Sequence, residues 1–165
     1  TGCISLSIAT ERPQTRVYAT DLSPQAIALA RRNRDALDLQ ERVEVIECDL
    51  VEGVPVELAQ SFSVLVSNPP YIPTSVLEQE VPAEVKGFEP ELALDGGEDG
   101  LDIYRRLLDA APRMLLPGGM LCIELYEGHL DKAAHLAEEQ SVWESVEVKE
   151  DLTHRPRILV AHLAK

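Results

Sequence analysis

Apolar residues recur along the chain in short runs, separated by longer segments with a different spacing. The short runs are rich in valine, isoleucine and leucine and are flanked by turn-forming residues, which is typical of buried strands. They predict strands at residues 16–20, 42–48, 62–67, 120–125, 145–148 and 157–162.

The segments between these runs carry apolar residues at helical spacing. Ser23 can cap a helix that has Pro24 at its first position. Residues 103–116 and 130–139 show the same helical pattern, and an apolar run at 3–9 opens the chain with a further helix. Since parallel strands need a crossover that is normally a helix, this succession predicts an α/β fold with a mainly parallel, doubly wound sheet. No helix lies between the last two predicted strands, so we expect the final strand to return antiparallel.

The start of the chain departs from this order. Thr1 and Gly2 lead straight into the first helix, whereas a doubly wound sheet normally begins with a strand. We therefore expect the first strand, and any upstream domain, to precede Thr1. With 165 residues and 45% hydrophobic content, the chain suits one domain over residues 1–165 whose start is incomplete.

The charge balance is strongly acidic. The chain has 29 acidic and 15 basic side chains, a formal net charge of -14, and such a surface repels phosphate backbones, so nucleic acid is a disfavoured partner. No apolar run approaches the roughly 20 residues that span a bilayer. No basic and apolar leader opens the chain, so we expect a cytoplasmic protein without a membrane partner. The three cysteines lie far apart with no histidine cluster beside them, so no metal site is expected.

Four polar residues stand at or just after the carboxyl ends of predicted strands: Asp21, Asp49, Asn68 and Glu124. Ligands of doubly wound sheets bind beyond these strand ends, so the four are the first candidates for chemistry. Glu124 could shape the floor of a pocket, although an acid at a strand end is more often solvated.

The spacing between Gly2 and Asp21 is about the twenty residues that separate a glycine turn from a ribose-binding acid. A carboxylate there can accept both ribose hydroxyls, and a glycine at a helix start lets a ligand approach the backbone amides. Asp21 could instead be a solvated acid at a helix start, and Gly2 a simple cap. The spacing does not separate a dinucleotide from S-adenosylmethionine.

Asp49 ends the next strand and could accept from an adenine amino group, while Leu50 or Leu22 covers a face of the ring. Its alternative is an ordinary loop aspartate.

The sharpest signal is Asn68-Pro69-Pro70-Tyr71, which directly follows a buried apolar run. Proline has no N–H and keeps the preceding residue extended, so this turn offers acceptors and few donors. The Asn68 side-chain oxygen and the Pro69 carbonyl can hold both hydrogens of a planar NH2 group, and Tyr71 can lie against its flat face. Such a turn aligns a poorly nucleophilic nitrogen with a methyl group. The alternative, a rigid turn or a proline-rich ligand, is weaker because a buried strand precedes it.

Several segments together resemble one enzyme family. Residues 66–72 are similar to its signature, and Thr1-Gly2-Cys3-Ile4 is similar to the end of its glycine-rich cofactor loop. Phe88, Glu89 and Pro90, followed by a glycine-rich turn at 96–100, resemble the segment after the signature. The family is HemK, class I methyltransferases that modify the glutamine of the Gly-Gly-Gln loop in peptide-chain release factors. The resemblance covers nearly the whole chain.

The resemblance implies methyl transfer from S-adenosyl-L-methionine, with S-adenosyl-L-homocysteine as product, to the glutamine N5 of a release factor, the expected protein partner. It implies a seven-stranded, Rossmann-like methyltransferase sheet with an antiparallel last strand, of which the first strand is missing here. Asn68 and Pro69 would grip the amide beside Pro70 and Tyr71, with a possible pocket at Phe88, Glu89, Pro90 and Glu124. The implied cofactor-binding residues are Thr1, Gly2, Cys3, Asp21, Leu22, Asp49, Leu50 and Asn68.

Three alternatives stay open at this point. The first is a methyltransferase acting on an exocyclic amino group of adenine or guanine, against which the charge and the 4% aromatic content count. The second is a hydride-transfer dehydrogenase, since Asp21 would serve NAD equally well, but this leaves the Asn-Pro-Pro-Tyr turn unexplained. The third is a module of the same fold that only binds partners.

Overall fold

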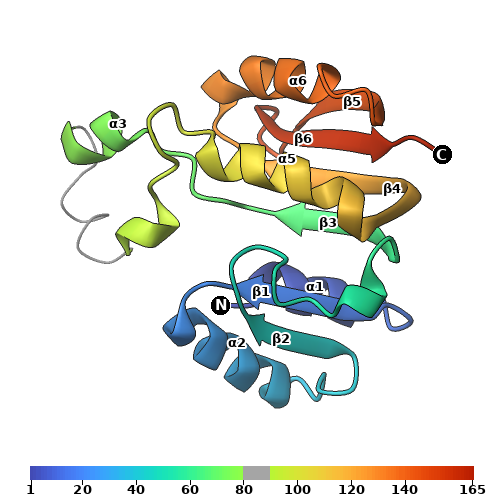
Figure 1. Cartoon of the computed structure of the whole chain (residues 1–165). Coiled ribbons are helices and arrows are strands. Elements are labelled where there is room, and N and C mark those ends of the chain that lie inside the picture. Colours follow the sequence, from blue (N-terminus) through green and yellow to red (C-terminus); the bar gives the residue numbers. More distant parts are fainter. Residues whose placement is uncertain (80–89) are drawn as a thin grey trace. The chain divides into compact units, whose positions relative to one another are not determined.

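The computed structural model describes residues 1–79 and 90–165. The chain forms two compact units, Thr1–Glu57 and Leu58–Lys165, which are described separately (Figure 1). The single domain expected over residues 1–165 stays a prediction. Within the described ranges no helix has the length and apolar content needed to cross a membrane.

The first unit pairs two parallel strands with two helices. Its elements are α1 (Cys3–Glu11), β1 (Val17–Asp21), α2 (Pro24–Ala36) and β2 (Val43–Glu47). The ladder runs from Val17 beside Val43 to Asp21 beside Glu47, so both strands end at one edge. The N-terminus and the arrowheads of β1 and β2 lie on that same side (Figure 1). The core consists of apolar side chains from α1, α2, β2 and the turn before β2: Leu6, Ala9, Ile27, Ala30, Leu39, Val43 and Val45. Val17 and Ala19 of β1 are partly buried against it.

The start of α2 follows the predicted capping pattern. Ser23 Oγ accepts a hydrogen bond from the Ala26 backbone N–H at 3.3 Å, and Pro24 occupies the first helical position. The cap satisfies one donor that the first helical turn leaves free.

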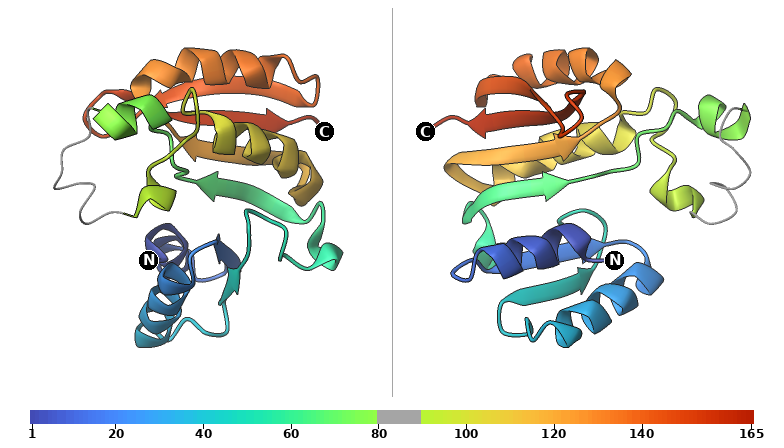
Figure 2. Two further views of the ribbon diagram at one scale, coloured as in Figure 1. Left: turned by 60° about the vertical axis from the view of Figure 1, so that its left-hand side comes forward. Right: turned by 180° about the vertical axis from the view of Figure 1, so that it is seen from behind.

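The second unit is a four-stranded sheet with helices packed along it. Its elements are β3 (Phe62–Ser67), α3 (Thr74–Gln79), η2 (Glu91–Ala93), α5 (Asp102–Met114), β4 (Leu115–Glu124), η3 (Glu127–His129), α6 (Leu130–Glu138), β5 (Trp143–Glu150) and β6 (Pro156–Leu163); a short helix, η1 (Val56–Leu58), spans the junction of the units. The strand order is β3-β4-β6-β5. β3 runs parallel to β4, and β6 is antiparallel to both of its neighbours, which confirms the antiparallel last strand. Figure 2 shows α5 along β3 and β4, and α6 along β5 and β6.

The boundary between α5 and β4 differs from the prediction. The helix ends at Met114 and not at residue 116, and the strand already begins at Leu115, ahead of the predicted Met120. Leu115 adopts extended angles, φ -77° and ψ 140°. Pro117, Gly118 and Gly119 suggest a turn, but the ladder to β3 continues past them with a register shift.

A buried tyrosine joins the two long helices of this unit. Tyr104 of α5 is fully buried, and its hydroxyl donates to the Ala133 carbonyl oxygen of α6 at 2.6 Å. Burial raises the pKa of Tyr104. The hydroxyl therefore stays protonated as a donor, as a buried polar group requires.

The described residues between Asn68 and Gly100 contain the short helix α3 and an isolated parallel bridge between Ile72 and Asp95. The Ile72 N–H donates to Leu94 O (3.0 Å) and the Gly96 N–H to Ile72 O (2.8 Å). Gly100 has φ 75°, and a Cβ there would lie 2.5 Å from His129 Cε1 and closer still to the Tyr71 carbonyl oxygen. A glycine is therefore required where this loop touches the Asn-Pro-Pro-Tyr turn.

We predict that Gly100→Ala destabilises the fold more than Gly118→Ala does. Gly118 has φ 78° but only the Lys165 side chain near its Cβ position, at 3.8 Å. Both variants share a left-handed cost of roughly 1–2 kcal/mol. The clash at Gly100 should add about 1–3 kcal/mol of overpacking. Chemical denaturation of both variants gives the difference, and equal free energies of unfolding would contradict the close contact.

Candidate functional site

The carboxylate of Asp21 stands at the carboxyl end of β1 and is exposed. Its Oδ1 accepts a hydrogen bond from the Ser23 backbone N–H at 2.9 Å, which shapes the turn into α2. Asp21 Oδ2 makes no intramolecular hydrogen bond in the described part of the chain. An exposed carboxylate with an oxygen available suits a pair of ribose hydroxyls.

Gly2 occupies the N-cap of α1 with φ 75°, and no side chain caps this helix. A Cβ at Gly2 would lie 3.2 Å from the Ala30 Cβ, so the glycine lets the start of α1 pack closely on α2. Asn33 Nδ2 donates to the Thr1 carbonyl oxygen at 3.1 Å and holds the preceding residue. No side-chain cap satisfies the first N–H groups of α1. A helix start of this kind can bind an anionic or polar ligand. Cys3, the next residue, is exposed.

Asp49 follows β2 at the same edge as Asp21. The Cys48 N–H donates to the Asp21 carbonyl oxygen at 3.0 Å and ties the two strand ends together. Leu50 next to it has φ 47°, a left-handed conformation that costs roughly 1–2 kcal/mol for a residue with a side chain. Leu22 is 51% exposed beside Asp21, as an apolar residue that covers a ligand would be. The first unit therefore brings its predicted cofactor residues to one edge of the sheet.

The Asn-Pro-Pro-Tyr turn follows β3 in the second unit. Asn68 is exposed, Pro69 is buried and Tyr71 is half-buried. Across residues 1–79 and 90–165, no hydrogen bond occupies the Asn68 side chain. The parallel register sets Ser67 beside Ile123, so the next residues, Asn68 and Glu124, share the carboxyl edge of β3 and β4.

Of the other residues expected to line a pocket, the structure describes only Pro90. Phe88 and Glu89 lie outside the described residues. Pro90 is exposed and precedes η2, where its carbonyl oxygen accepts from the Ala93 N–H at 2.8 Å. In this structure Pro90 therefore has the role of a helix start.

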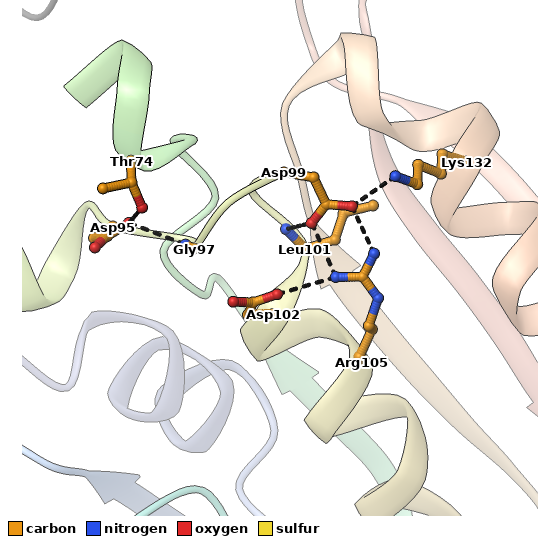
Figure 3. Close-up of polar contacts among 8 residues, drawn as sticks. All are labelled: Thr74, Asp95, Gly97, Asp99, Leu101, Asp102, Arg105 and Lys132. Atoms are coloured by element: carbon orange, nitrogen blue, oxygen red, sulfur yellow. Dashed lines mark hydrogen bonds and ion pairs between the residues drawn. The ribbon is translucent and has the colours of Figure 1, made fainter. Parts of the chain in front are cut away.

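Two aspartates that sequence reasoning missed hold the loop behind the turn (Figure 3). Asp95 Oδ1 accepts from Thr74 Oγ1 at 2.8 Å and from the Gly97 N–H at 2.9 Å. Thr74 lies shortly after Tyr71, so Asp95 ties the segment after the turn to the glycine-rich loop.

Asp99 forms the second anchor, at the start of α5. Arg105 of α5 binds both of its carboxylate oxygens, at 2.6 and 2.9 Å, and Lys132 of α6 binds Oδ2 at 2.6 Å (Figure 3). These hydrogen bonds, Arg105 first and then Lys132, hold the pKa of Asp99 well below its usual range. The loop is thereby fixed to two helices. The alternation of aspartate and glycine at 95–100 signals a turn, but only the fold supplies these basic partners.

Known proteins resemble this chain over most of its length. The model of the methyltransferase small domain matches residues 1–85. A release factor glutamine methyltransferase from Clostridium acetobutylicum is 37% identical over 163 residues, which are 97% of this chain and 55% of that protein. One from Moorella thermoacetica is 41% identical over 161 residues, 98% of this chain and 55% of that protein. The chain thus spans about half the length of these curated relatives.

The fold is also that of solved methyltransferases. The crystal structure of a methyltransferase from Pyrococcus furiosus superposes with a TM-score of 0.70 at 18% identity, over 99% of this chain and 70% of that one. This likeness confirms an α/β methyltransferase fold. The identities to the curated relatives over nearly the whole chain go further and confirm the resemblance predicted from several segments of the sequence: this chain belongs to the release factor glutamine methyltransferase family.

Proposed function

We propose that the complete protein transfers a methyl group from S-adenosylmethionine to the side-chain amide nitrogen of the glutamine in the Gly-Gly-Gln motif of a peptide-chain release factor. The observation that carries the proposal is the exposed Asn68 amide, free of intramolecular hydrogen bonds in the described ranges, at the carboxyl end of β3. Family membership supports the choice of substrate. A cytoplasmic location belongs to the same proposal, because release factors act at the ribosome.

The residues of the first unit fit the proposed cofactor. Asp21 would accept from the ribose hydroxyls, Asp49 would accept from the adenine amino group, and Leu22 and Leu50 would cover the ring. The uncapped start of α1 at Gly2 would face the amino-acid part. When bound, S-adenosylmethionine supplies a methyl group on a sulfonium, which leaves as a neutral thioether when the methyl group passes to nitrogen. The seven-stranded sheet expected from the sequence belongs to this proposal, and the strand order β3-β4-β6-β5 supports it.

The acceptor turn would work by hydrogen bonding and alignment. Neither Pro69 nor Pro70 has an N–H, so the turn presents oxygens only. Asn68 Oδ1 and the Pro69 carbonyl would each accept one hydrogen of the amide NH2, which fixes the plane of the group and aims its nitrogen. These hydrogen bonds strengthen as the nitrogen gains positive charge, and the extra proton then leaves to solvent. No histidine base is needed before the transfer.

The acidic surface favours a protein substrate over nucleic acid. A net charge of -14 repels a phosphate backbone. The proposal is tested by incubating the complete protein with methyl-labelled S-adenosylmethionine and either a release factor or nucleic acid. Label on the release-factor glutamine is expected. If only the nucleic acid carried label, the methyl acceptor would be an exocyclic amino group of adenine or guanine and not the glutamine amide.

We predict that Asn68→Ala lowers kcat for methyl transfer about 10²-fold or more, as removal of one catalytic hydrogen bond does. Cofactor affinity should change little, because the variant removes an acceptor for the substrate amide. Ser63→Ala is the matched control, because Ser63 is an exposed polar residue on β3, the strand that leads to Asn68. Initial rates and cofactor titrations of both variants check this, and equal loss of binding and turnover in Asn68→Ala would contradict the assignment.

We predict that Asp21→Ala weakens S-adenosylmethionine binding by about 10- to 100-fold, the effect of losing charge-assisted hydrogen bonds. Asp21→Asn separates two roles, since its amide oxygen still accepts from the Ser23 N–H and only the charge is lost. If the carboxylate binds ribose, both variants should bind the cofactor more weakly in calorimetric titration. Full affinity in Asp21→Asn would reduce Asp21 to a turn residue.

A further inference from the structure

A pocket of about 310 Å³ opens in the second unit beside the Asn-Pro-Pro-Tyr turn. It is lined by Tyr71, Glu124, Asp151, Arg157 and Ile158. This volume lies at the small end of ligand sites, which span roughly 300–1,000 Å³, and suits a few residues of extended peptide. Its lining combines carboxylates, a guanidinium and apolar surface.

The sheet register fixes where this pocket lies. Glu124 ends β4 beside Ile158 of β6, and on the other side of β4 the ladder to β3 leads directly to Asn68. Tyr71, the last residue of the turn, lines the pocket itself. A chain segment seated in the pocket therefore continues toward the residue that would grip the amide.

Arg157 is held as a fixed donor. Its guanidinium carbon lies 5.8 Å from the centroid of the Tyr126 ring, a cation–π distance. Its carbonyl oxygen accepts from the Leu125 N–H at 2.9 Å, which fixes the backbone. Glu124 is exposed, and no hydrogen bond or ion pair to its carboxylate occurs within the described residues. The pocket thus offers one positioned donor group and one available acceptor group.

Asp151 builds the rim. Its Oδ1 accepts from the Thr153 N–H (2.7 Å), the Thr153 hydroxyl (2.7 Å) and the Arg155 N–H (3.2 Å). The Thr153 hydroxyl contributes most to lowering the pKa of Asp151, so the carboxylate stays charged and keeps the turn closed. The next residue, Leu152, is fully exposed at 101%, and Tyr126 is 45% exposed. Both side chains are therefore available to contact apolar groups of a bound segment.

We propose that this pocket binds the main chain of the polypeptide that carries the methyl-accepting glutamine. A peptide N–H donates to the Glu124 carboxylate, and a neighbouring peptide carbonyl accepts from the Arg157 guanidinium. Leu152 and Tyr126 contact apolar side chains of the same segment. A peptide backbone supplies a donor and an acceptor side by side, which matches the pair, whereas a phosphate would meet the carboxylates of Glu124 and Asp151. The inference rests on the proposed function and names the surface that holds its substrate.

The test measures methylation of a release factor by the complete protein with Glu124→Ala, Arg157→Met and Leu152→Ser. The expected result is a KM for the release factor raised about 10-fold in each of the first two variants, as loss of a hydrogen bond to a charged group implies. Leu152→Ser should raise KM by a smaller factor. The Kd for S-adenosylmethionine should stay unchanged in all three, and Arg157→Lys should restore part of the loss. Glu144→Ala and Arg113→Met, which remove exposed charges elsewhere on the unit, serve as controls.

The possible results distinguish a failure of the pocket inference from a failure of the proposed function. If the unaltered protein labels no release factor, the proposed function fails. If it labels the factor and the variants keep the original KM, the pocket inference alone is overturned. A loss of cofactor affinity in Glu124→Ala would also overturn it, by assigning that carboxylate to the cofactor. Leu152 is fully exposed, so Leu152→Ser decides the matter even where another variant fails to fold.

Discussion

Parallel pairing of β3 with β4 is the constraint on which the candidate acceptor site depends. The ladder sets Ser67 beside Ile123, so the chain leaves both strands at the same edge. Asn68 and Glu124 lie at this shared edge although more than fifty residues separate them in sequence. The antiparallel β6 on the far side of β4 extends that edge to Arg157. The edge beside the turn is therefore built by β3, β4 and β6.

A turn made of two prolines needs support from outside itself. Pro69 and Pro70 have no N–H groups that could donate hydrogen bonds to neighbouring segments. The turn is therefore fixed by the segment that follows it and by the glycine-rich loop. Asp95 and Asp99 fix that loop to α3, α5 and α6 (Figure 3). Charged side chains thus hold the scaffold, while the Asn68 side chain makes no hydrogen bond within the described residues. This division is the one expected if the proposed reaction depends on alignment and not on proton abstraction.

The first unit also brings the ends of two parallel strands to one edge. Two parallel strands end together, and the start of α1 lies on the same side (Figure 1). Each polar group there also has a structural role: Asp21 shapes the turn into α2, and Gly2 lets two helices pack. A substitution at one of these positions therefore needs a second, more conservative variant beside it. Asp21→Asn, for example, separates an effect on binding from an effect on folding.

The sequence by itself determined the order of helices and strands, the antiparallel return of β6 and the acceptor turn after β3. These features are local: apolar periodicity, a serine cap before a proline, and prolines without N–H groups act over a few neighbouring residues. The end of α5 was predicted two residues too late, because Leu115 already pairs with Phe62 of β3, a contact between residues far apart in sequence. Only the tertiary structure decided that Arg105 and Lys132 hold Asp99, and that Arg157 faces a pocket beside Tyr71. Those contacts join residues far apart along the chain, and their geometry exists only once the strands have paired.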